Sequence, residues 1–440
     1  MTETYHILTF GCQMNENDSE KIAGILTKAG YEKSENPKEC DALVINTCSV
    51  RENADDRFFG NLGEYKAVKK KNPNMIICVC GCMMQQEIFV NEINEKYPFV
   101  DIIFGTHNIE NFGELLRRFK ETKKRITEIK QNSEIAENIP CKREYKHKAY
   151  VSITFGCDNF CSYCIVPYTR GREKSREAEN IVKEITELAK NGCKEVMLLG
   201  QNVNSYGKGL EVPCSFAELL KKVSKIKGIE RVRFMTSHPK DLTDDVIEAI
   251  LSSDKICRNI HLPFQAGSDR ILKLMNRKYT KEYYISLVKK LREKIPDITI
   301  STDIIVGFPT ETEKDFEQTL DVVKKCKFES AFTFIYSPRE GTRAAKMEEQ
   351  VPKEITSERF ARLLKTLEGV VEESVGIYES TVQEVIVDGV SKNDPGVLCG
   401  RTKTNKLVNF RGDCALGDTV DVKITKVNTY YLYGEVIQKN

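Results

Sequence analysis

The sequence lacks the features of membrane-spanning, secreted and disulfide-stapled proteins. It has no Trp, only 5 His and 13 Pro among 440 residues, and no stretch that approaches the roughly 18 apolar residues of a membrane helix. Its first residues contain no basic run followed by an apolar segment, so no secretory signal is expected. We therefore expect a cytoplasmic protein that makes no use of a membrane.

The charge is almost balanced, and this also limits the possible functions. A net charge of +2 supplies no general attraction for nucleic acid, so any phosphate binding has to come from local patches. A content of 40% hydrophobic and 30% charged residues is typical of globular domains, and the length predicts two or three of them. The 16 Cys are too sparse for a disulfide scaffold, and in a reducing compartment clustered cysteines are better suited to metal binding.

The first part of the chain predicts an α/β domain over residues 1–118. Helix-like stretches separate four short apolar runs, each typical of a buried parallel strand, and this alternation indicates a doubly wound parallel sheet. The runs cover residues 6–12, 42–48, 75–82 and 100–105. A charged segment over 119–146, which contains Pro140, is expected to be a linker.

Residues 147–374 predict a partial (β/α)6 barrel, with its chemistry at the C-terminal ends of the strands. The expected strands are 149–155, 195–199, 230–235, 258–262, 298–305 and 331–336, and the stretches between them have helical spacing. A long helical pattern over 354–375 is followed by strand-like alternation with turns at Gly389, Gly396 and Gly412. Residues 375–440 are therefore expected to form a small β-barrel.

Three cysteines follow the first barrel strand with the spacing C-x3-C-x2-C: Cys157, Cys161 and Cys164. Three thiolates on one loop can hold three irons of a [4Fe–4S] cluster and leave the fourth iron open. S-adenosylmethionine (SAM) can chelate that iron, and one electron from the cluster then cleaves a carbon–sulfur bond to give a radical. A structural zinc would need a fourth ligand, and no Cys or His follows closely.

A second trio, Cys12, Cys48 and Cys82, lies in the N-terminal domain, each at the end of an apolar run. The C-terminal ends of parallel strands meet at one edge of a sheet, so these three side chains can converge. Spacing alone leaves open whether they bind metal or are ordinary buried cysteines, and Cys80 competes with Cys82.

The residues around both trios resemble the tRNA methylthiotransferases, which are radical-SAM enzymes. The resemblance lies in segments 11–15, 46–53, 80–83 and 155–172, and within the family it is strongest to the MiaB branch. It implies an auxiliary [4Fe–4S] cluster on Cys12, Cys48 and Cys82, with an open iron that supplies or carries the transferred sulfur. It also implies two SAM molecules, one as methyl donor and one as radical source.

That branch methylthiolates C2 of N6-(dimethylallyl)adenosine beside the anticodon of tRNA, giving 2-methylthio-N6-(dimethylallyl)adenosine. The implied partners are a tRNA anticodon stem-loop, an external electron donor and a sulfur supply, and we expect a monomer. Two alternatives stay open. One is methylthiolation of threonylcarbamoyladenosine tRNA or of a ribosomal-protein aspartate, and the other is a non-enzymatic RNA-binding protein with structural zinc.

Further candidates are polar and basic residues. Those at the remaining strand ends are candidates for SAM binding, although each is also typical of a cap or turn: Gln201, Asn202, Ser237 and Gln265. In the C-terminal region, segment 400–410 resembles the family's TRAM domain, which implies binding of the tRNA backbone by Arg401, Lys403, Lys406 and Arg411. A local electropositive path toward the triplet is expected from Arg170, Arg172, Lys174 and Arg176.

Overall fold

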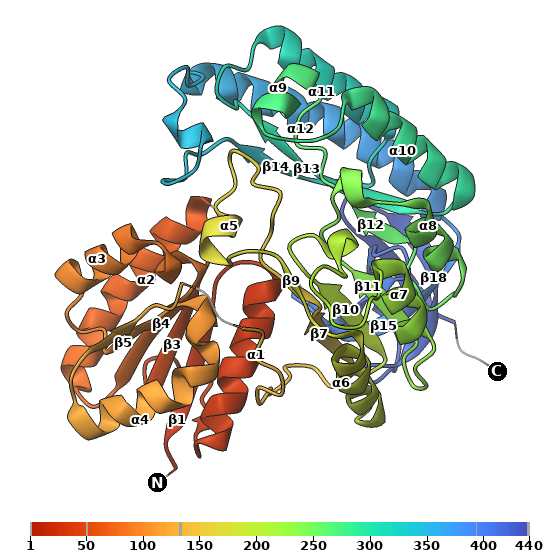
Figure 1. Cartoon of the computed structure of the whole chain (residues 1–440). Helices are drawn as coiled ribbons and strands as arrows, with labels where there is room; N and C mark the ends of the chain where they lie inside the picture. The colour runs from red at the N-terminus through yellow and green to blue at the C-terminus, as the bar shows by residue number, and fades with distance from the viewer. Residues whose placement is uncertain (1, 50–51, 132–133, 393, 438–440) are drawn as a thin grey trace.

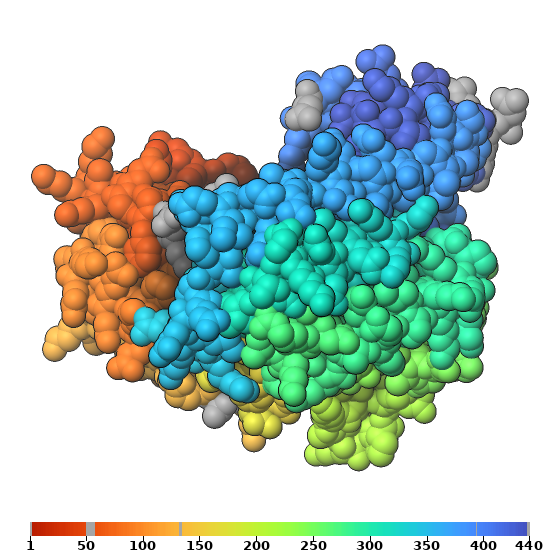
Figure 2. Space-filling model, turned by 90° about the horizontal axis from the view of Figure 1, so that it is seen from above, coloured from red at the N-terminus to blue at the C-terminus, as the bar shows by residue number. Residues whose placement is uncertain are grey.

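Three bodies follow one another along the chain in the computed structural model, which describes residues 2–49, 52–131, 134–392 and 394–437, with only the backbone of 52–57. A parallel-sheet domain, a partial barrel and a small closed barrel occupy separate regions of the molecule (Figures 1 and 2). This confirms the expected fold class. Within the described segments, no helix combines the length and apolar character needed to cross a membrane.

The N-terminal domain is a six-stranded parallel sheet in the order β2-β1-β3-β4-β5-β6. Helices α1 (Gln13–Lys28) and α4 (Phe112–Thr122) cover one face, and α2 (Glu52–Lys71) and α3 (Glu87–Lys96) cover the other. The central strands are buried on both faces, which explains their continuous apolar runs. The strands are β1 (Thr4–Thr9), β2 (Glu32–Lys33), β3 (Ala42–Thr47), β4 (Ile76–Gly81), β5 (Ile102–Phe104) and β6 (Ile126–Glu128).

The expected linker over 119–146 differs from the structure. Helix α4 continues to Thr122, and β6 pairs with β5 as the edge strand of the sheet. The sequence of this segment does not show a strand pattern, because β6 is short and contributes only Ile126 to the core. Beyond β6, the chain crosses to the barrel, where Arg143 bonds Glu20 of α1 (2.7 Å) and Glu184 (2.6 Å).

The central domain is a partial barrel built from two three-stranded parallel sheets, β11-β10-β7 and β12-β13-β14. A bridge between Val232 and Ile256 joins them, and the helices pack outside around one large core. The strands are β7 (Lys148–Ser152), β10 (Glu195–Leu199), β11 (Arg231–Phe234), β12 (Asn259–His261), β13 (Thr299–Val306) and β14 (Ser330–Ile335). The helices are α6 (Ala178–Lys190), α7 (Phe216–Ser224), α8 (Asp244–Leu251), α9 (Asp269–Leu274), α10 (Lys281–Lys294), α11 (Glu313–Cys326) and α12 (Lys353–Val375).

The first barrel strand ends earlier than expected. After β7, the short strand β8 (Thr154–Phe155) turns away and pairs in antiparallel fashion with β9 (Lys174–Ser175). The residues between β8 and β9 form a loop that contains the one-turn helix α5 (Val166–Thr169). This small ribbon therefore closes the base of the loop that carries the cysteine triplet.

The C-terminal domain is a closed barrel in the order β15-β16-β17-β19-β18. Its strands are β15 (Val382–Ser391), β16 (Asp394–Thr402), β17 (Leu407–Arg411), β18 (Thr419–Val427) and β19 (Leu432–Val436). The turns expected at Gly389 and Gly396 are wrong, because these residues lie within β15 and β16. The start of β16, Asp-Pro-Gly, is poor in strand-forming residues, but Asp394 still pairs with Ser391 of β15.

Two buried arginines of β11 hold the closed barrel against the partial barrel. Arg231 is 1% exposed and donates to the carbonyls of Arg401 (2.6 Å) and Glu384 (2.9 Å). Arg233 donates to the carbonyl of Thr402 (2.7 Å). Because the acceptors are mainly backbone oxygens, the contact fixes the position of the C-terminal barrel largely independently of its side chains.

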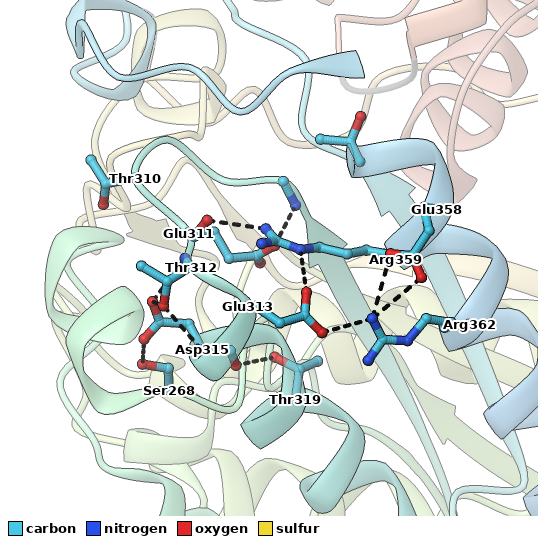
Figure 3. A network of polar contacts seen from close by, with 12 residues as sticks. Ser268, Thr310, Glu311, Thr312, Glu313, Asp315, Thr319, Glu358, Arg359 and Arg362 are labelled. Carbon is cyan, nitrogen blue, oxygen red and sulfur yellow. Dashed lines mark hydrogen bonds and ion pairs between the residues drawn. The ribbon is translucent and has the colours of Figure 1, made fainter. Parts of the chain in front are cut away.

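A buried ion pair fixes the loop that follows β13 (Figure 3). Arg359 of α12 donates to Glu311 Oε1 (2.9 Å) and to the Glu311 carbonyl (3.0 Å), and Glu311 accepts from the Gly307 amide (3.1 Å). Burial raises the pKa of Glu311 to about 7, and Gly307 and Arg359 act against that rise. The loop at the C-terminal end of β13 is thereby tied to the last helix of the barrel.

We expect Arg359→Met to lower the free energy of unfolding by about 3 kcal/mol, because it leaves the Glu311 carboxylate buried without its partner. A folded-state pKa above the ordinary value means that stability falls as pH rises from about 4.5 through 7. At pH 5 the Glu311 carboxyl is mostly protonated in the folded protein, whereas at pH 8 it is ionised and depends on the charge of Arg359. The loss caused by Arg359→Met should therefore be larger at pH 8 than at pH 5, as measured by urea unfolding.

Arg362→Met is the matched control. Arg362 pairs with Glu313 (2.6 Å) and Glu358 (3.3 Å) at 39% side-chain exposure, so its removal should cost about 0–1 kcal/mol at either pH. Equal losses for the two variants, or a loss for Arg359→Met that does not depend on pH, would contradict this account.

Candidate active site

The first cysteine trio converges at the C-terminal edge of the N-terminal sheet. Cys12 follows β1 and caps α1, Cys48 follows β3, and Cys82 follows β4. These strands are neighbours in the sheet, in the order β1-β3-β4. Residues about 35 positions apart in the sequence are therefore brought to one place, as expected.

Asn15 lies among the three cysteines. Its Oδ1 is 3.8 Å from Cys12 Sγ and 3.9 Å from Cys82 Sγ, and its Nδ2 donates to the Thr47 carbonyl (2.7 Å), next to Cys48. Asn15 is fully buried and its amide is further held by Asn46. The sequence contained this residue in a motif, but its central place depends on long-range contacts.

Two glycines allow the strand ends to approach this closely. A Cβ on Gly11 would lie 2.7 Å from Cys48 Cβ, and one on Gly81 would lie 2.3 Å from the Thr47 carbonyl oxygen. Both residues have positive φ, at 120° and 98°. Glycine is therefore required for steric reasons directly before Cys12 and directly before Cys82.

Cys80 is not in competition with Cys82. It lies within β4 and packs in the hydrophobic cluster beneath α1 and α4, together with Cys78. Burial raises the pKa of the Cys80 thiol well above its ordinary value. Burial also raises the pKa of Cys82, to about 12, but there the Arg170 guanidinium acts in the opposite direction. A cation beside Cys82 favours the thiolate that a metal requires.

Arg170 reaches Cys82 from the other domain. Its Nε donates to Cys82 Sγ (3.2 Å), and its Nη2 donates to Asp18 Oδ2 (2.8 Å) and Asn15 Oδ1 (3.2 Å). The expected electropositive path is therefore wrong at this residue, whose charge is buried and paired. It is also wrong at Arg176, which pairs with Glu137 and Glu184.

The second trio lies on the loop between β8 and α5. The Cys164 amide donates to the Cys161 carbonyl (3.0 Å). Burial raises the pKa of the Cys164 thiol to about 12, and the nearby Cys161 thiol raises it further. Arg277 is buried and its Nη1 is 3.5 Å from Cys161 Sγ. Each trio thus has one buried arginine directed at one of its sulfurs.

A short chain of contacts connects the two trios. The Cys157 amide donates to the Gly171 carbonyl (3.1 Å), and Gly171 follows Arg170, which bonds Cys82. In addition, Thr106 of the N-terminal domain donates to the Thr169 carbonyl (3.0 Å). The loop that carries the second trio is therefore anchored beside the first.

The two cysteine trios are the candidate ligand sets for iron–sulfur clusters. Across residues 2–49, 52–131, 134–392 and 394–437, no group of three or more His, Cys, Asp or Glu side chains is arranged to hold a metal ion. A cluster is bound differently, because each cysteine sulfur binds a different iron. Three thiols could hold three irons of such a cluster, and an arginine N–H would then lie beside one sulfur of each trio.

Several strand ends near the triplet carry buried polar atoms without a hydrogen-bond partner among the described residues, namely Asn202 Oδ1, Ser237 Oγ and both amide atoms of Asn204. Three non-glycine residues at these ends also have positive φ: Thr236 (70°), Gln265 (68°) and Thr310 (70°). Unsatisfied atoms and strained backbone gather where a ligand completes a site. Asn202 and Ser237, which are predicted SAM contacts, carry such atoms. Gln201 is only partly buried, and the sequence did not single out Asn204.

The four predicted RNA-binding cations do not share one surface. Arg401 and Arg411 are exposed, but they lie toward opposite ends of β17, since Arg401 pairs with Leu407 at its start. Lys403 is 3.4 Å from Glu384. Lys406 points inward and donates to the Glu329 carbonyl (3.2 Å), and burial lowers its pKa. Lys406 therefore joins the two barrels.

A cavity of about 930 Å³ extends along the interior of the partial barrel. At one end it is lined by Arg401 and Lys406 of the C-terminal barrel, and it reaches Gln13, the neighbour of Cys12. Inward-facing Met197 and Phe332 line its middle. Much of its lining comes from the N-terminal ends of the barrel strands, and none of the six cysteines of the two trios is among the lining residues.

Three families match successive parts of the chain. Residues 4–105 match the uncharacterized protein family UPF0004, residues 151–323 the Radical SAM superfamily, and residues 377–437 the TRAM domain. Radical SAM membership implies a [4Fe–4S] cluster and SAM. In fold, the chain is similar to the radical S-adenosylmethionine methyltransferase TsrM from Kitasatospora setae, with a TM-score of 0.56 at 14% identity over 78% of this chain and 77% of that one.

Relatives of much higher identity extend over nearly the whole chain. A tRNA-2-methylthio-N(6)-dimethylallyladenosine synthase of Alkaliphilus oremlandii is 55% identical over 99% of this chain and 93% of its own length. Its namesake in Clostridium tetani is 56% identical over 99% of this chain and 96% of its own length. The chain therefore belongs to the tRNA-2-methylthio-N(6)-dimethylallyladenosine synthase family of radical-SAM methylthiotransferases.

Proposed function

We propose that this protein methylthiolates C2 of N6-(dimethylallyl)adenosine next to the anticodon of tRNA. The radical cluster would be held by Cys157, Cys161 and Cys164, and the auxiliary cluster by Cys12, Cys48 and Cys82. When bound, the clusters and two SAM molecules supply the radical, the methyl group and the transferred sulfur. In this proposal the enzyme acts in the cytoplasm as a monomer and receives an electron from an external donor.

The observation that carries the proposal is the connection between the two trios. A radical generator and a sulfur-bearing cluster have to act on the same atom, so they have to share one cavity. The contacts from Cys157 through Gly171 and Arg170 to Cys82 support such a shared site. An aromatic C–H at C2 has no acidic proton and no leaving group, and polar side chains alone would not activate it.

The chain's own residues bind and orient the partners in this proposal. Asn202, Ser237, Gln265 and the less buried Gln201 are the SAM-binding candidates, because the first two carry unsatisfied atoms and Gln265 has a strained backbone. Arg401, Lys403 and Arg411 remain candidates for phosphate contacts, whereas Lys406 has an internal role.

The choice of substrate rests on the relatives, which match this chain over nearly their full length. They are named as synthases of tRNA 2-methylthio-N(6)-dimethylallyladenosine. Threonylcarbamoyladenosine tRNA and a ribosomal-protein aspartate are the competing substrates. We expect anaerobically reconstituted protein, incubated with SAM, a reductant and dimethylallylated tRNA, to give 2-methylthio-N6-(dimethylallyl)adenosine by mass spectrometry. Unmodified and threonylcarbamoylated tRNA serve as comparison substrates, and preferential reaction of either would overturn the proposal.

Metal content tests the two cluster sites separately. Two cubane clusters predict about eight irons per chain. Joint substitution of Cys12, Cys48 and Cys82 by Ala, or of Cys157, Cys161 and Cys164 by Ala, should each leave about four irons. Cys80→Ala is the matched control and should retain about eight, since Cys80 packs in the core. Loss of iron with Cys80→Ala, or no loss with either triple variant, would contradict the assignment.

Substitution of both Lys403 and Arg411 by Gln is expected to weaken tRNA binding, because these cations are candidates for phosphate contacts. If each neutralises one phosphate, the negative slope of log affinity against log salt should decrease in magnitude by about 1 to 2. Lys289→Gln is the control, since Lys289 is a highly exposed cation on the outer helix α10. Unchanged affinity and slope in the double variant would rule out Lys403 and Arg411 as phosphate contacts.

A further inference from the structure

Arg170 belongs to one domain by its backbone and to the other by its side chain. Its amide bonds the Val166 carbonyl (2.8 Å), which fixes it to α5 on the loop that carries Cys164. All three partners of its guanidinium, namely Cys82, Asp18 and Asn15, belong to the N-terminal domain. The side chain is 6% exposed, so these bonds form only when the two domains are in contact.

We propose that Arg170 is a positioning residue that sets the reduction potential of the auxiliary cluster and makes that potential depend on the docking of the two domains. The inference rests on the proposed function, because it takes Cys82 to be an iron ligand.

The physical basis is the electrostatics of a cysteine sulfur bound to iron. A reduced cluster carries one more negative charge than an oxidised one, so an N–H donor or a cation beside the sulfur stabilises the reduced form and raises the potential. Burial strengthens this effect, since water and salt screen the charge of Arg170 less than they would at a surface. Asp18 neutralises part of that charge, so its carboxylate should lower the potential.

The radical triplet provides an internal contrast. Arg277 lies 3.5 Å from Cys161 Sγ, but its other hydrogen bonds go to the Pro263 carbonyl (2.7 Å) and the Tyr279 hydroxyl (2.9 Å). These partners all belong to the radical-SAM domain. The cation beside the radical cluster is therefore held within one domain, whereas the cation beside the auxiliary site is supplied by a neighbouring domain.

The test is a redox titration of the auxiliary cluster, followed by electron paramagnetic resonance. The full chain carries Cys157→Ala, Cys161→Ala and Cys164→Ala, so that only the auxiliary cluster contributes to the signal. We expect Arg170→Gln to shift the midpoint potential to more negative values and Asp18→Asn to shift it to more positive values. A purely structural role predicts no such opposite shifts, so an unchanged potential or two shifts of the same sign would overturn the inference.

Arg172→Gln is the matched control, because it removes the same charge two residues away. Its side chain is 68% exposed and pairs with Asp158 (2.7 Å), so the potential should not change. Arg170→Lys keeps the charge and should restore part of the shift, and thermal unfolding of each metal-free variant checks that it folds. If Arg170→Gln binds no iron, the Arg170→Lys and Asp18→Asn titrations decide. An auxiliary cluster that is absent before any change at Arg170 would refute the proposed function instead.

Discussion

Buried arginines directed across the domain boundaries are the interaction on which the rest of the structure depends. Arg170 joins the N-terminal domain to the radical-SAM loop, and Arg231 and Arg233 join the partial barrel to the C-terminal barrel. A buried guanidinium is costly unless carboxylates, carbonyls or other acceptors satisfy it. Each boundary supplies such acceptors, so the arrangement of the three domains is as specific as the packing within them.

This arrangement places the loop of the second cysteine trio beside the first trio. The N-terminal sheet brings its trio to one edge, and the partial barrel presents the second trio on a loop anchored against that edge. Residues of the C-terminal barrel line part of a separate cavity, which contains none of these cysteines. The glycines before Cys12 and Cys82 allow the strand ends to come together, because only a residue without a Cβ permits the approach of Cys48 and Thr47. Chemistry that needs two clusters on one atom is consistent with this geometry.

Much of the fold could be predicted from local patterns in the sequence. Buried strands and amphipathic helices have clear periodicities. The spacing C-x3-C-x2-C made the second cysteine trio a candidate, whereas for the first trio position after strands left metal binding open and the family resemblance was needed. The edge strand β6 and strand β16 were missed, because their residues are polar or poor strand formers and pairing with neighbours decides their conformation.

The errors in the predicted site have a different origin. Arg170 and Arg176 were read as part of a surface path, and Lys406 as a phosphate contact, because a sequence shows a cation's charge but not its partners. Asn15 became notable only once Cys12 and Cys82 were seen on either side of it. Contacts between residues far apart in the chain decide whether a charged or polar side chain is structural, positioning or exposed.

The central claim concerns the product formed in tRNA, and the most direct measurement is mass spectrometry of total tRNA nucleosides. A bacterial strain that lacks its own enzyme of this family should accumulate N6-(dimethylallyl)adenosine, and expression of this chain should convert it to the 2-methylthio nucleoside. Variants lacking either cysteine trio should fail to do so. Persistence of the unconverted nucleoside with the intact, iron-loaded chain, together with methylthiolation of threonylcarbamoyladenosine, would contradict the account.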